Sequence, residues 1–385
     1  MRVKLKDIFD LQMGKTPSRS NLEYWNTTDY KWISIADLTK TSKYIFETKE
    51  YLSKSAIKDS GIKVIPANTV VMSFKLSIGK TAITKEDMYS NEAIMAFKDK
   101  HVINIIPEYI FYLFKYKNWE ECSNKAVMGK TLNKATLSEI EVEICSIEKQ
   151  RQIVNILDKI MSAVDGRKQE LQLLDELIKA RFVEMFGDPV KNPKGWEVVT
   201  IGDIVTEVRY GTSKPAVEGG KYPYLRMNNL TADGHLDLND LKYIDIPDDE
   251  IEKCVVRKGD VLFNRTNSIE LVGKTVVFDL QEDMIIAGYI IRVRLNKRLL
   301  PEILSQYMNL EALKDILRSM AKGAVNQANI NAQELRSIKV YIPDMELQKQ
   351  FIEMKNQVDK SKVAVQKALD ETQMLFDSLM QEYFG

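Results

Sequence analysis

The chain has 385 residues, 44% of them hydrophobic, which is enough for two or three domains with cores of their own. Its 55 basic and 55 acidic residues give a formal net charge of zero, which excludes a polycation that coats nucleic acid through bulk charge. The chain contains only two histidines and three cysteines, without paired ligand spacing, which argues against a disulfide framework, a zinc site and histidine-based catalysis.

Residues 1–146 predict a compact α/β domain. Short β-rich runs such as "NTVVMSF" (68–74) alternate there with Gly, Pro and Asn turns, and a helix-like stretch follows near 107–117. The same alternation of β-rich runs and turns occurs in residues 188–343, where "DVLFN" (260–264) is one of the strand-like runs. We therefore expect an α/β (α+β) protein with two similar domains.

A long helical segment follows each domain, at residues 147–187 and 344–385. Hydrophobic residues recur in both segments at alternating spacings of four and three, without proline, which is typical of helices that pack along a narrow seam. At 1.5 Å per residue, about 40 residues give a helix of roughly 60 Å. Two such helices pair most simply as an antiparallel coiled coil, which would relate the two domains by a pseudo-twofold axis. The predicted seam comprises Ile153, Leu157, Ile160, Val164, Leu171, Leu174, Ile178, Phe351, Met354, Val358, Val365, Leu375 and Leu379.

Further hydrophobic side chains of the first long helix lie off this seam. We expect them to contact partner subunits, while packing against the α/β domains is the alternative. They are Ile156, Met161, Leu173, Leu177, Phe182 and Phe186.

The second half of the chain repeats the first at an offset of about 191 to 198 residues. "VIPANTVVMSF" (64–74) aligns with "VVRKGDVLFNR" (255–265), and "EMFG" (184–187) aligns with "EYFG" (382–385). These matches run nearly from end to end, so we expect an internal duplication.

The tripeptide Gly-Lys-Thr, which can mark a phosphate-binding loop, begins at Gly14, Gly79, Gly129 and Gly273. A Walker A loop needs another glycine five residues earlier, and none of these copies has one. The duplication accounts for the glycines better, because each has a glycine partner in the other half. They therefore predict recurring turns rather than a nucleotide site.

Motifs of known catalytic arrangements are absent from the sequence. It contains no G-x-S-x-G, H-E-x-x-H or G-x-G-x-x-G, no Asn-Pro-Pro-aromatic motif, and no nuclease pattern after its Pro-Asp pairs. We therefore expect a chain that is not an enzyme.

Basic, amide and small polar residues surround the recurring glycines. Arg and Lys can bridge guanine or phosphate, and Asn and Gln can bridge adenine, so such loops are typical of DNA reading, although surface turns use the same residues. "NRTNS" (264–268) falls opposite "SFKLS" (73–77), as expected if two copies of one scaffold read different sequences; drift of surface loops is the alternative. The candidate contacts in the first domain are Lys15, Thr16, Ser18, Arg19, Lys75, Ser77, Lys80, Lys130, Asn133 and Lys134. Those in the second domain are Tyr210, Thr212, Ser213, Lys214, Arg226, Asn228, Asn229, Asn264, Arg265, Asn267, Ser268, Lys274, Asn326, Gln327 and Asn329.

Several dispersed stretches in a fixed order carry a resemblance to a known family. They include "GKTPSRSNLEYWNTTDYKWISIADL" (14–38), "GDVLFNRTNSIELVGKTVVF" (259–278) and "NQANINAQELRSIKVYIPDMELQKQ" (326–350). With these stretches, nearly the whole chain resembles the specificity (S) subunits of type I DNA restriction-modification systems.

The resemblance implies a non-catalytic subunit that binds double-stranded DNA. Two target recognition domains would each read half of a bipartite asymmetric site, and the paired helices would fix the gap between the half-sites and dock two methyltransferase (M) subunits. S-adenosylmethionine, ATP and magnesium would belong to the M subunits and the restriction (R) subunits, and this chain would hold no cofactor.

Two other interpretations remain open from the sequence. One is a stand-alone DNA-binding protein or methyltransferase-associated regulator with the same recognition fold, and the other is an adaptor whose domains bind protein. The N-terminal residues lack the apolar stretch of a signal peptide, and the apolar runs are too short to span a bilayer, so we expect a cytoplasmic protein.

Overall fold

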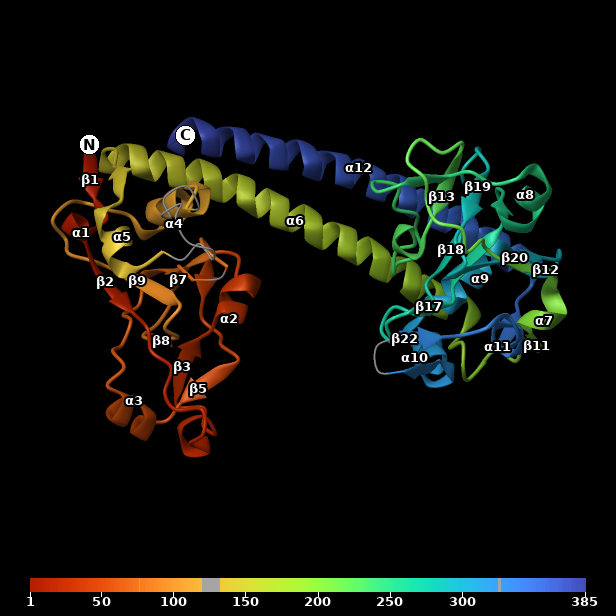
Figure 1. Cartoon of the computed structure of the whole chain (residues 1–385), viewed down its shortest axis with the longest axis horizontal. Coiled ribbons are helices and arrows are strands. Elements are labelled where there is room, and N and C mark those ends of the chain that lie inside the picture. The colour runs from red at the N-terminus through yellow and green to blue at the C-terminus, as the bar shows by residue number, and fades with distance from the viewer. Residues whose placement is uncertain (76, 120–131, 325–326) are drawn as a thin grey trace. The chain divides into compact units, whose positions relative to one another are not determined.

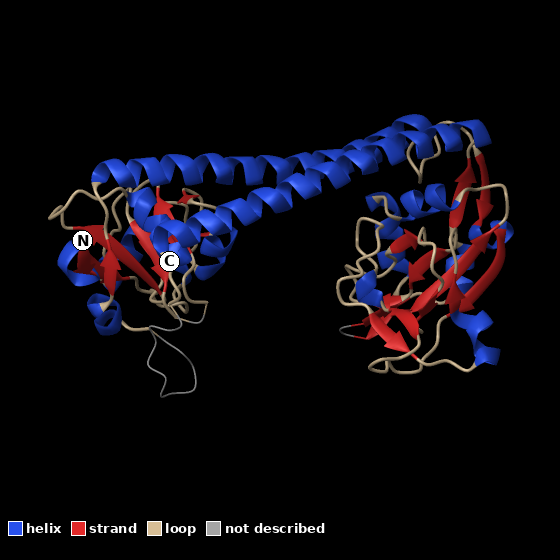
Figure 2. Ribbon diagram, turned by 90° about the horizontal axis from the view of Figure 1, so that it is seen from above, coloured by secondary structure: helices blue, strands red, loops and turns tan. Residues whose placement is uncertain are grey.

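The computed structural model describes residues 1–75, 77–119, 132–324 and 327–385. These residues form two compact units (Figure 1). The first unit comprises Met1–Gly166 with Ala368–Gly385, and the second comprises Arg167–Lys367. Both units combine helices with sheets, as Figure 2 shows, so the α/β class predicted from the sequence is confirmed.

The first unit contains a five-stranded sheet with the strand order β2-β9-β6-β7-β4. A three-stranded sheet, β5-β3-β8, and a two-stranded sheet, β1-β10, accompany it. The strands are β1 (Arg2–Lys4), β2 (Phe9–Met13), β3 (Tyr30–Ile33), β4 (Tyr44–Ile45), β5 (Glu50–Leu52), β6 (Val70–Ser73), β7 (Thr81–Thr84), β8 (Tyr89–Ser90), β9 (Ile94–Asp99) and β10 (Glu141–Glu143). The short helices are α1 (Leu5–Ile8), η1 (Leu22–Tyr24), α2 (Ile35–Lys40), α3 (Lys54–Ser60), α4 (Pro107–Tyr116) and α5 (Lys134–Glu139).

The second unit contains two four-stranded sheets, β12-β20-β16-β18 and β14-β13-β19-β15, with a three-stranded sheet β17-β22-β21 and the pair β11-β23. The strands are β11 (Glu197–Thr200), β12 (Val205–Tyr210), β13 (Tyr222–Leu225), β14 (Lys242–Ile244), β15 (Val255–Val256), β16 (Val261–Asn264), β17 (Thr266–Asn267), β18 (Thr275–Val277), β19 (Met284–Ile286), β20 (Ile290–Leu295), β21 (Lys322–Ala324), β22 (Gln327–Asn329) and β23 (Lys339–Ile342). The short helices are α7 (Ile201–Ile204), η2 (Met227–Asn229), α8 (Asp248–Cys254), α9 (Pro301–Met308), α10 (Glu311–Met320) and α11 (Ala332–Ser337).

Strand pairing confirms the internal duplication. The antiparallel order β2-β9-β6-β7 of the first unit returns as β12-β20-β16-β18 in the second. Likewise, β3 pairs antiparallel with β5 and parallel with β8, just as β13 pairs with β14 and β19. The aligned sequence stretches therefore fold into equivalent elements.

Two helices of 40 residues each, α6 (Ile147–Phe186) and α12 (Met345–Phe384), run through both units. In the first unit, Ile153 near the start of α6 shares a core with Met380 near the end of α12. In the second unit, Phe182 near the end of α6 packs edge to face on Phe351 near the start of α12, with ring centroids 5.2 Å apart. Because opposite ends meet in each unit, the helices pair antiparallel, as predicted.

The predicted seam is wrong at Leu375, whose side chain is 51% exposed. The next residue, Phe376, is buried instead and belongs to the core of the first unit, together with Met380. The strict heptad misses this because a straight α-helix advances about 20° per heptad relative to a 3.5-residue repeat, so a buried stripe shifts by one residue along a long helix. The other predicted seam residues are buried or partly buried.

Three of the predicted partner-facing residues pack inside the units instead. Phe182 and Phe186 are fully buried in the core of the second unit, and Met161 packs against the core of the first. They lie where the α/β domains cover α6, which the helical pattern alone does not show. Ile156, Leu173 and Leu177 remain exposed, and their interface role stays a prediction.

No helix in the described part of the chain combines the length and the apolar composition needed to cross a membrane.

Candidate nucleic-acid interface

Of the Gly-Lys-Thr glycines, Gly14, Gly79 and Gly273 lie in the described part of the chain, and Gly129 lies outside it. Gly79 and Gly273 have φ of 88° and 85°, a conformation that favours glycine, and each follows an equivalent strand, β6 or β16. Gly14 lies against the backbone of β8 so closely that a Cβ would approach the carbonyl oxygen of Ser90 to 2.3 Å. Its repeat partner Gly211 approaches β19 in the same way. Backbone geometry in each copy therefore explains these glycines.

Lys274, predicted to contact phosphate, is buried, and that prediction is wrong. Its ammonium group donates to the carbonyl oxygens of Met227 at 3.1 Å and Leu230 at 2.6 Å, which lie at the ends of η2. Burial lowers the pKa of this ammonium group. Its repeat partner Lys80 donates to the hydroxyl of Thr39 from a more exposed position. Lys274 thus holds a loop in place within the domain.

We expect Lys274→Met to lower the free energy of unfolding by about 1 to 3 kcal/mol, because two carbonyl groups lose their partner. Lys80→Met is the matched control, since it removes the equivalent lysine where the nitrogen is solvated, and should change stability by less than about 0.5 kcal/mol. Urea denaturation of the full chain measures both. An unchanged stability in Lys274→Met, accompanied by weaker DNA binding, would restore the phosphate role.

Two more predicted contacts, Asn229 and Asn264, are also buried and serve the fold. Asn229 closes η2 by accepting from the backbone of Arg226 and donates to the carbonyl of Asp237. Asn264 donates to the carbonyls of Thr266 and Tyr289. Neither side chain can reach DNA, because tertiary contacts satisfy its polar atoms inside the domain.

The structure brings the "NRTNS" segment together with residues far away in the sequence. β17, at Thr266–Asn267, pairs antiparallel with β22, at Gln327–Asn329, and the Thr266 hydroxyl donates to the Asn329 side chain at 2.8 Å. The Asn267 amide donates to Asn264 at 2.8 Å. An ordered polar surface is therefore built from two separate segments of the second unit, β17 and β22, which carry labels in Figure 1.

Arg265 is the prominent cation of this surface. Its guanidinium carbon lies 4.9 Å from the centre of the Tyr210 ring, at the end of β12, and the Tyr210 hydroxyl accepts from the backbone of Ala332. Its backbone is fixed on both sides, because its N–H donates to the carbonyl of Tyr289 and its own carbonyl accepts from Ile330. Among the described residues, Arg265 has no carboxylate partner, and its buried Nε has no hydrogen-bond partner. The guanidinium thus lies against the Tyr210 ring, and no carboxylate among the described residues neutralises it.

Several other predicted DNA contacts of the second unit form ion pairs or hydrogen bonds with neighbouring residues of the same unit. Lys214 pairs with Glu250 at 2.8 Å, and Arg226 pairs with Asp240 at 2.7 Å. The Thr212 hydroxyl accepts from the backbone of Lys214. Ser213, Asn228 and Gln327 are exposed, and Ser268 is partly exposed. Asn326 lies outside the described residues.

In the first unit, Arg19 is held in a different environment. Its guanidinium carbon lies 3.7 Å from the centre of the Trp25 ring and 4.9 Å from that of Trp32, and the guanidinium also forms an ion pair with Glu50. Because the carboxylate already occupies the guanidinium, Arg19 has less to offer an anion than Arg265 has. Among the described residues, the arginine of the first unit therefore has a carboxylate partner and Arg265 of the second unit has none.

The remaining predicted contacts of the first unit surround the same loops. The Thr16 hydroxyl donates to Glu92, and this hydrogen bond lowers the pKa of that carboxyl. Asn133 caps α5 by accepting from the backbone of Thr136, so its side chain is used in the fold. Lys15, Ser18, Ser77 and Lys134 are exposed, Lys75 is partly exposed, and Lys130 lies outside the described residues.

Sequence reasoning missed three exposed hydrophobic residues close to the "NRTNS" segment. Ile269 and Leu271 follow it in the loop before β18, and Tyr289 contacts Arg265 and Asn264 through its carbonyl oxygen. Apolar side chains of this kind can contact the methyl group of thymine. The only sequence signal for the first two was their place next to a polar loop.

Comparison with known proteins places this architecture in a family. The sequence model of the type I restriction modification DNA specificity domain matches residues 1–176 and again residues 193–372. The chain belongs to this family.

Individual relatives of this specificity-domain chain are more distant. The specificity subunit of the type I restriction enzyme MjaIX of Methanocaldococcus jannaschii is 30% identical over 250 residues, which is 59% of this chain and 57% of that protein. The EcoKI specificity subunit of Escherichia coli K12 is 25% identical over 289 residues, which is 70% of this chain and 62% of that protein. The matches thus span less than two thirds of either relative.

The specificity-domain fold is also found among solved structures. One chain, from a structure that concerns complex assembly and conformational transition of the type I R-M system, matches with a TM-score of 0.60. It is 19% identical, and the match covers 100% of this chain and 97% of that one. This likeness supports the fold.

Proposed function

We propose that this chain is the DNA specificity subunit of a type I restriction-modification complex. Its two units would each read one half of a bipartite, asymmetric double-stranded site. The family membership and the duplicated recognition fold support this proposal.

The observation that carries it is the polar surface of the second unit. Arg265 lies against the Tyr210 ring and has no carboxylate partner within the described part of the chain, so the terminal amino groups of its planar guanidinium are the candidates for contact with a base. A planar guanidinium suits the two acceptors on the major-groove edge of guanine. The side chains of Asn267, Gln327 and Asn329 lie on the two paired strands next to it and can supply or accept further hydrogen bonds. The arrangement suits groove reading better than the binding of a single phosphate.

The exposed side chains of α6 support docking of two methyltransferase subunits. Leu173 and Leu177 are 54% and 43% exposed, and they lie one helical turn apart on the same helix face. Ile156 is exposed on the first half of the helix. Exposed leucines clustered on a helix are typical of a protein-protein contact.

In this proposal the chain is not an enzyme and holds no cofactor itself. S-adenosylmethionine would be bound by the methyltransferase subunits, and ATP with magnesium by the restriction subunits. The complex would act on DNA in the cytoplasm.

Exchanging residues 1–146 for those of a relative tests the proposal. We expect the exchange, made in the chain co-expressed with its methyltransferase, to change one half of the methylated sequence and leave the other half intact. Genome-wide mapping of methyladenine gives both halves in one measurement. An exchange of residues 188–343 is the reciprocal control and should change the other half.

Two outcomes would contradict the proposal. An unchanged methylated sequence after both exchanges would favour an adaptor whose domains bind protein. A chain that never associates with its co-expressed methyltransferase, judged by the mass of the purified complex, would favour a stand-alone DNA-binding protein.

A further inference from the structure

The connection between β8 and β9 in the first unit is the structural equivalent of the connection between β19 and β20 in the second, which contacts Arg265. In the second unit, the backbone N–H of Arg265 donates to the carbonyl of Tyr289 at 3.0 Å. In the first unit, the backbone N–H of Phe74 donates to the carbonyl of Ala93 at 2.9 Å. Because Phe74 aligns with Arg265 in the duplication, the two connections hold the same place in their domains.

The loop after β2 is also fixed in the same way as the loop after β12. The backbone N–H of Gly14 donates to the carbonyl of Ile94, and that of its repeat partner Gly211 donates to the carbonyl of Ile290, both at 3.1 Å. One backbone arrangement is therefore present in both units. We call it the loop frame: it comprises the loop after β2 or β12, the end of β6 or β16, and the connection β8-β9 or β19-β20.

The side chains on the loop frame differ between the units. In the second unit, Arg265 supplies a guanidinium, and Gly288 has no side chain. In the first unit, the position of Arg265 is taken by Phe74, which is buried. The position of Gly288 is taken by Glu92, which is exposed. The first unit therefore presents a carboxylate where the second unit has no side chain.

The carboxylate of Glu92 is held in place by the loop after β2. The Thr16 hydroxyl donates to its Oε2 atom. This hydrogen bond, with the positive charges of Lys75 and Arg19, lowers the pKa of the Glu92 carboxyl, so the group is ionised at neutral pH. A carboxylate has about four acceptor sites on its two oxygens, so the hydrogen bond from Thr16 leaves capacity for a ligand.

A carboxylate on a surface that contacts DNA is unfavourable unless a hydrogen-bond donor meets it, because the phosphates repel it. In the major groove, adenine, guanine and thymine each present at least one acceptor, which a carboxylate oxygen also repels. Cytosine presents the N4 amino group as a donor and no acceptor. The base edge that best suits an ionised glutamate is therefore that of cytosine.

We propose that Glu92 is a specificity-determining residue of the first unit and accepts a hydrogen bond from the N4 amino group of a cytosine in the first half-site. The nearby charges of Lys75 and Arg19 reduce the repulsion between this carboxylate and the phosphates. One loop frame thus reads a donor with Glu92 in the first unit and acceptors with Arg265 in the second. The inference rests on the proposed function and adds the class of base that the first unit reads.

Glu92→Gln tests the proposal in the complex assembled with its methyltransferase. Glutamine keeps an oxygen that can accept from Thr16, but it loses the negative charge and suits adenine better than cytosine. Once methyladenine mapping gives the site, binding is titrated with duplexes that vary one base pair of the first half-site at a time. We expect the wild type to bind about tenfold more weakly when one C·G pair is replaced. Glu92→Gln should lose this preference at that pair alone, with adenine gaining most.

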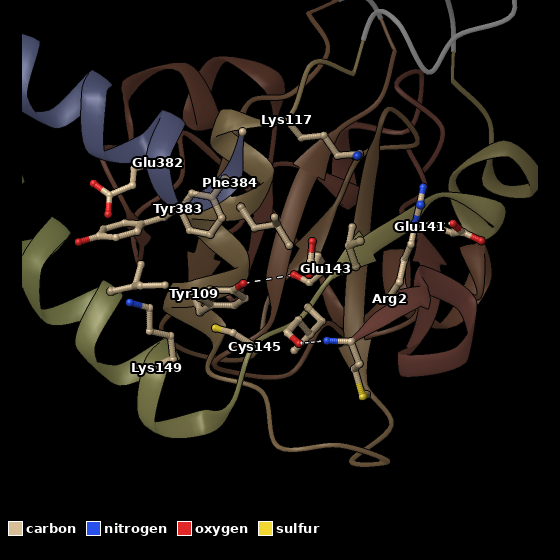
Figure 3. Close-up of a pocket in the computed structure, with 16 residues that line it drawn as sticks. Arg2, Tyr109, Lys117, Glu141, Glu143, Cys145, Lys149, Glu382, Tyr383 and Phe384 are labelled. Carbon is tan, nitrogen blue, oxygen red and sulfur yellow. Dashed lines mark hydrogen bonds and ion pairs between the residues drawn. The ribbon is translucent and has the colours of Figure 1, made fainter.

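Glu141→Gln is the matched control. Glu141 lies on β10, outside the two sheets that carry the loop frame, and its carboxylate pairs with Arg2 at 2.7 Å (Figure 3). The same exchange at this position should leave every base preference unchanged.

The outcomes separate this inference from the proposed function. If the wild type discriminates bases in both half-sites but Glu92→Gln keeps every preference of the first, the role of Glu92 is overturned and the proposed function stands. A uniform loss of affinity for all duplexes in Glu92→Gln has the same meaning. A wild-type complex without base preference in either half-site would overturn both.

Discussion

Replacement of Arg265 by alanine is expected to relax base discrimination at one position of the second half-site. The guanidinium lies against the Tyr210 ring and has no carboxylate partner among the described residues, so we expect its terminal amino groups, and not the buried Nε, to contact a base edge. Loss of one bidentate contact with guanine costs about 1 to 3 kcal/mol, which corresponds to roughly 5- to 150-fold in affinity. The first half-site should be read as before, because Arg265 belongs to the second unit.

The measurement uses the complex assembled with its methyltransferase. Once methyladenine mapping gives the site, binding is titrated with duplexes that vary one base pair of the second half-site at a time. Arg298→Ala is the control, because Arg298 is a surface arginine of the same unit already paired with Glu197 at 2.6 Å. A uniform loss across all duplexes, with a smaller salt dependence, would instead assign Arg265 to a phosphate.

The second large effect is a loss of stability, which we expect when Phe182 in the protein core is replaced by alanine. Phe182 is fully buried between Phe186 and Phe351, with ring centroids 4.8 Å and 5.2 Å away. Phe182→Ala should therefore lower the free energy of unfolding by about 3 to 5 kcal/mol, since it removes an aromatic ring and leaves a cavity. Urea denaturation of the purified chain measures this loss.

Leu173→Ala on the same helix is the contrasting variant. Leu173 is 54% exposed, so its removal should change stability by less than about 0.5 kcal/mol while weakening association with the methyltransferase. Co-purification and calorimetric titration of the two subunits report the association. If Phe182→Ala kept full stability and lost the partner instead, the roles assigned to the two residues would be reversed.

The domain organisation of the protein could be predicted from the sequence because it follows from the spacing of hydrophobic residues and from stretches that occur twice along the chain. The aligned stretches around Gly79 and Gly273 predicted a duplicated scaffold, and β6-β7 and β16-β18 are the equivalent hairpins that carry them. Heptad spacing without proline predicted the two long helices. The missing glycine before each Gly-Lys-Thr removed the nucleotide loop from consideration.

Only the tertiary structure decided which polar side chains are accessible at the surface and which are buried by contacts within the protein. Lys274 and Arg265 both lie in loops of similar composition, but one is buried against η2 and the other lies stacked on Tyr210 at the surface. Contacts between segments far apart in the sequence make this difference, and a local pattern does not record them. The pairing of β17 with β22 is an example.

By itself, the sequence determined the α/β class, the duplication and the antiparallel helices, since each follows from periodic burial or from a repeated string of residues. The tertiary structure decided which face of each helix is covered and which candidate contacts remain available. Phe182 and Leu173 occupy the same helix with similar hydrophobicity, yet one is buried and the other is exposed. The reason is physical: exposure depends on what packs against a side chain, and that partner comes from a distant part of the chain.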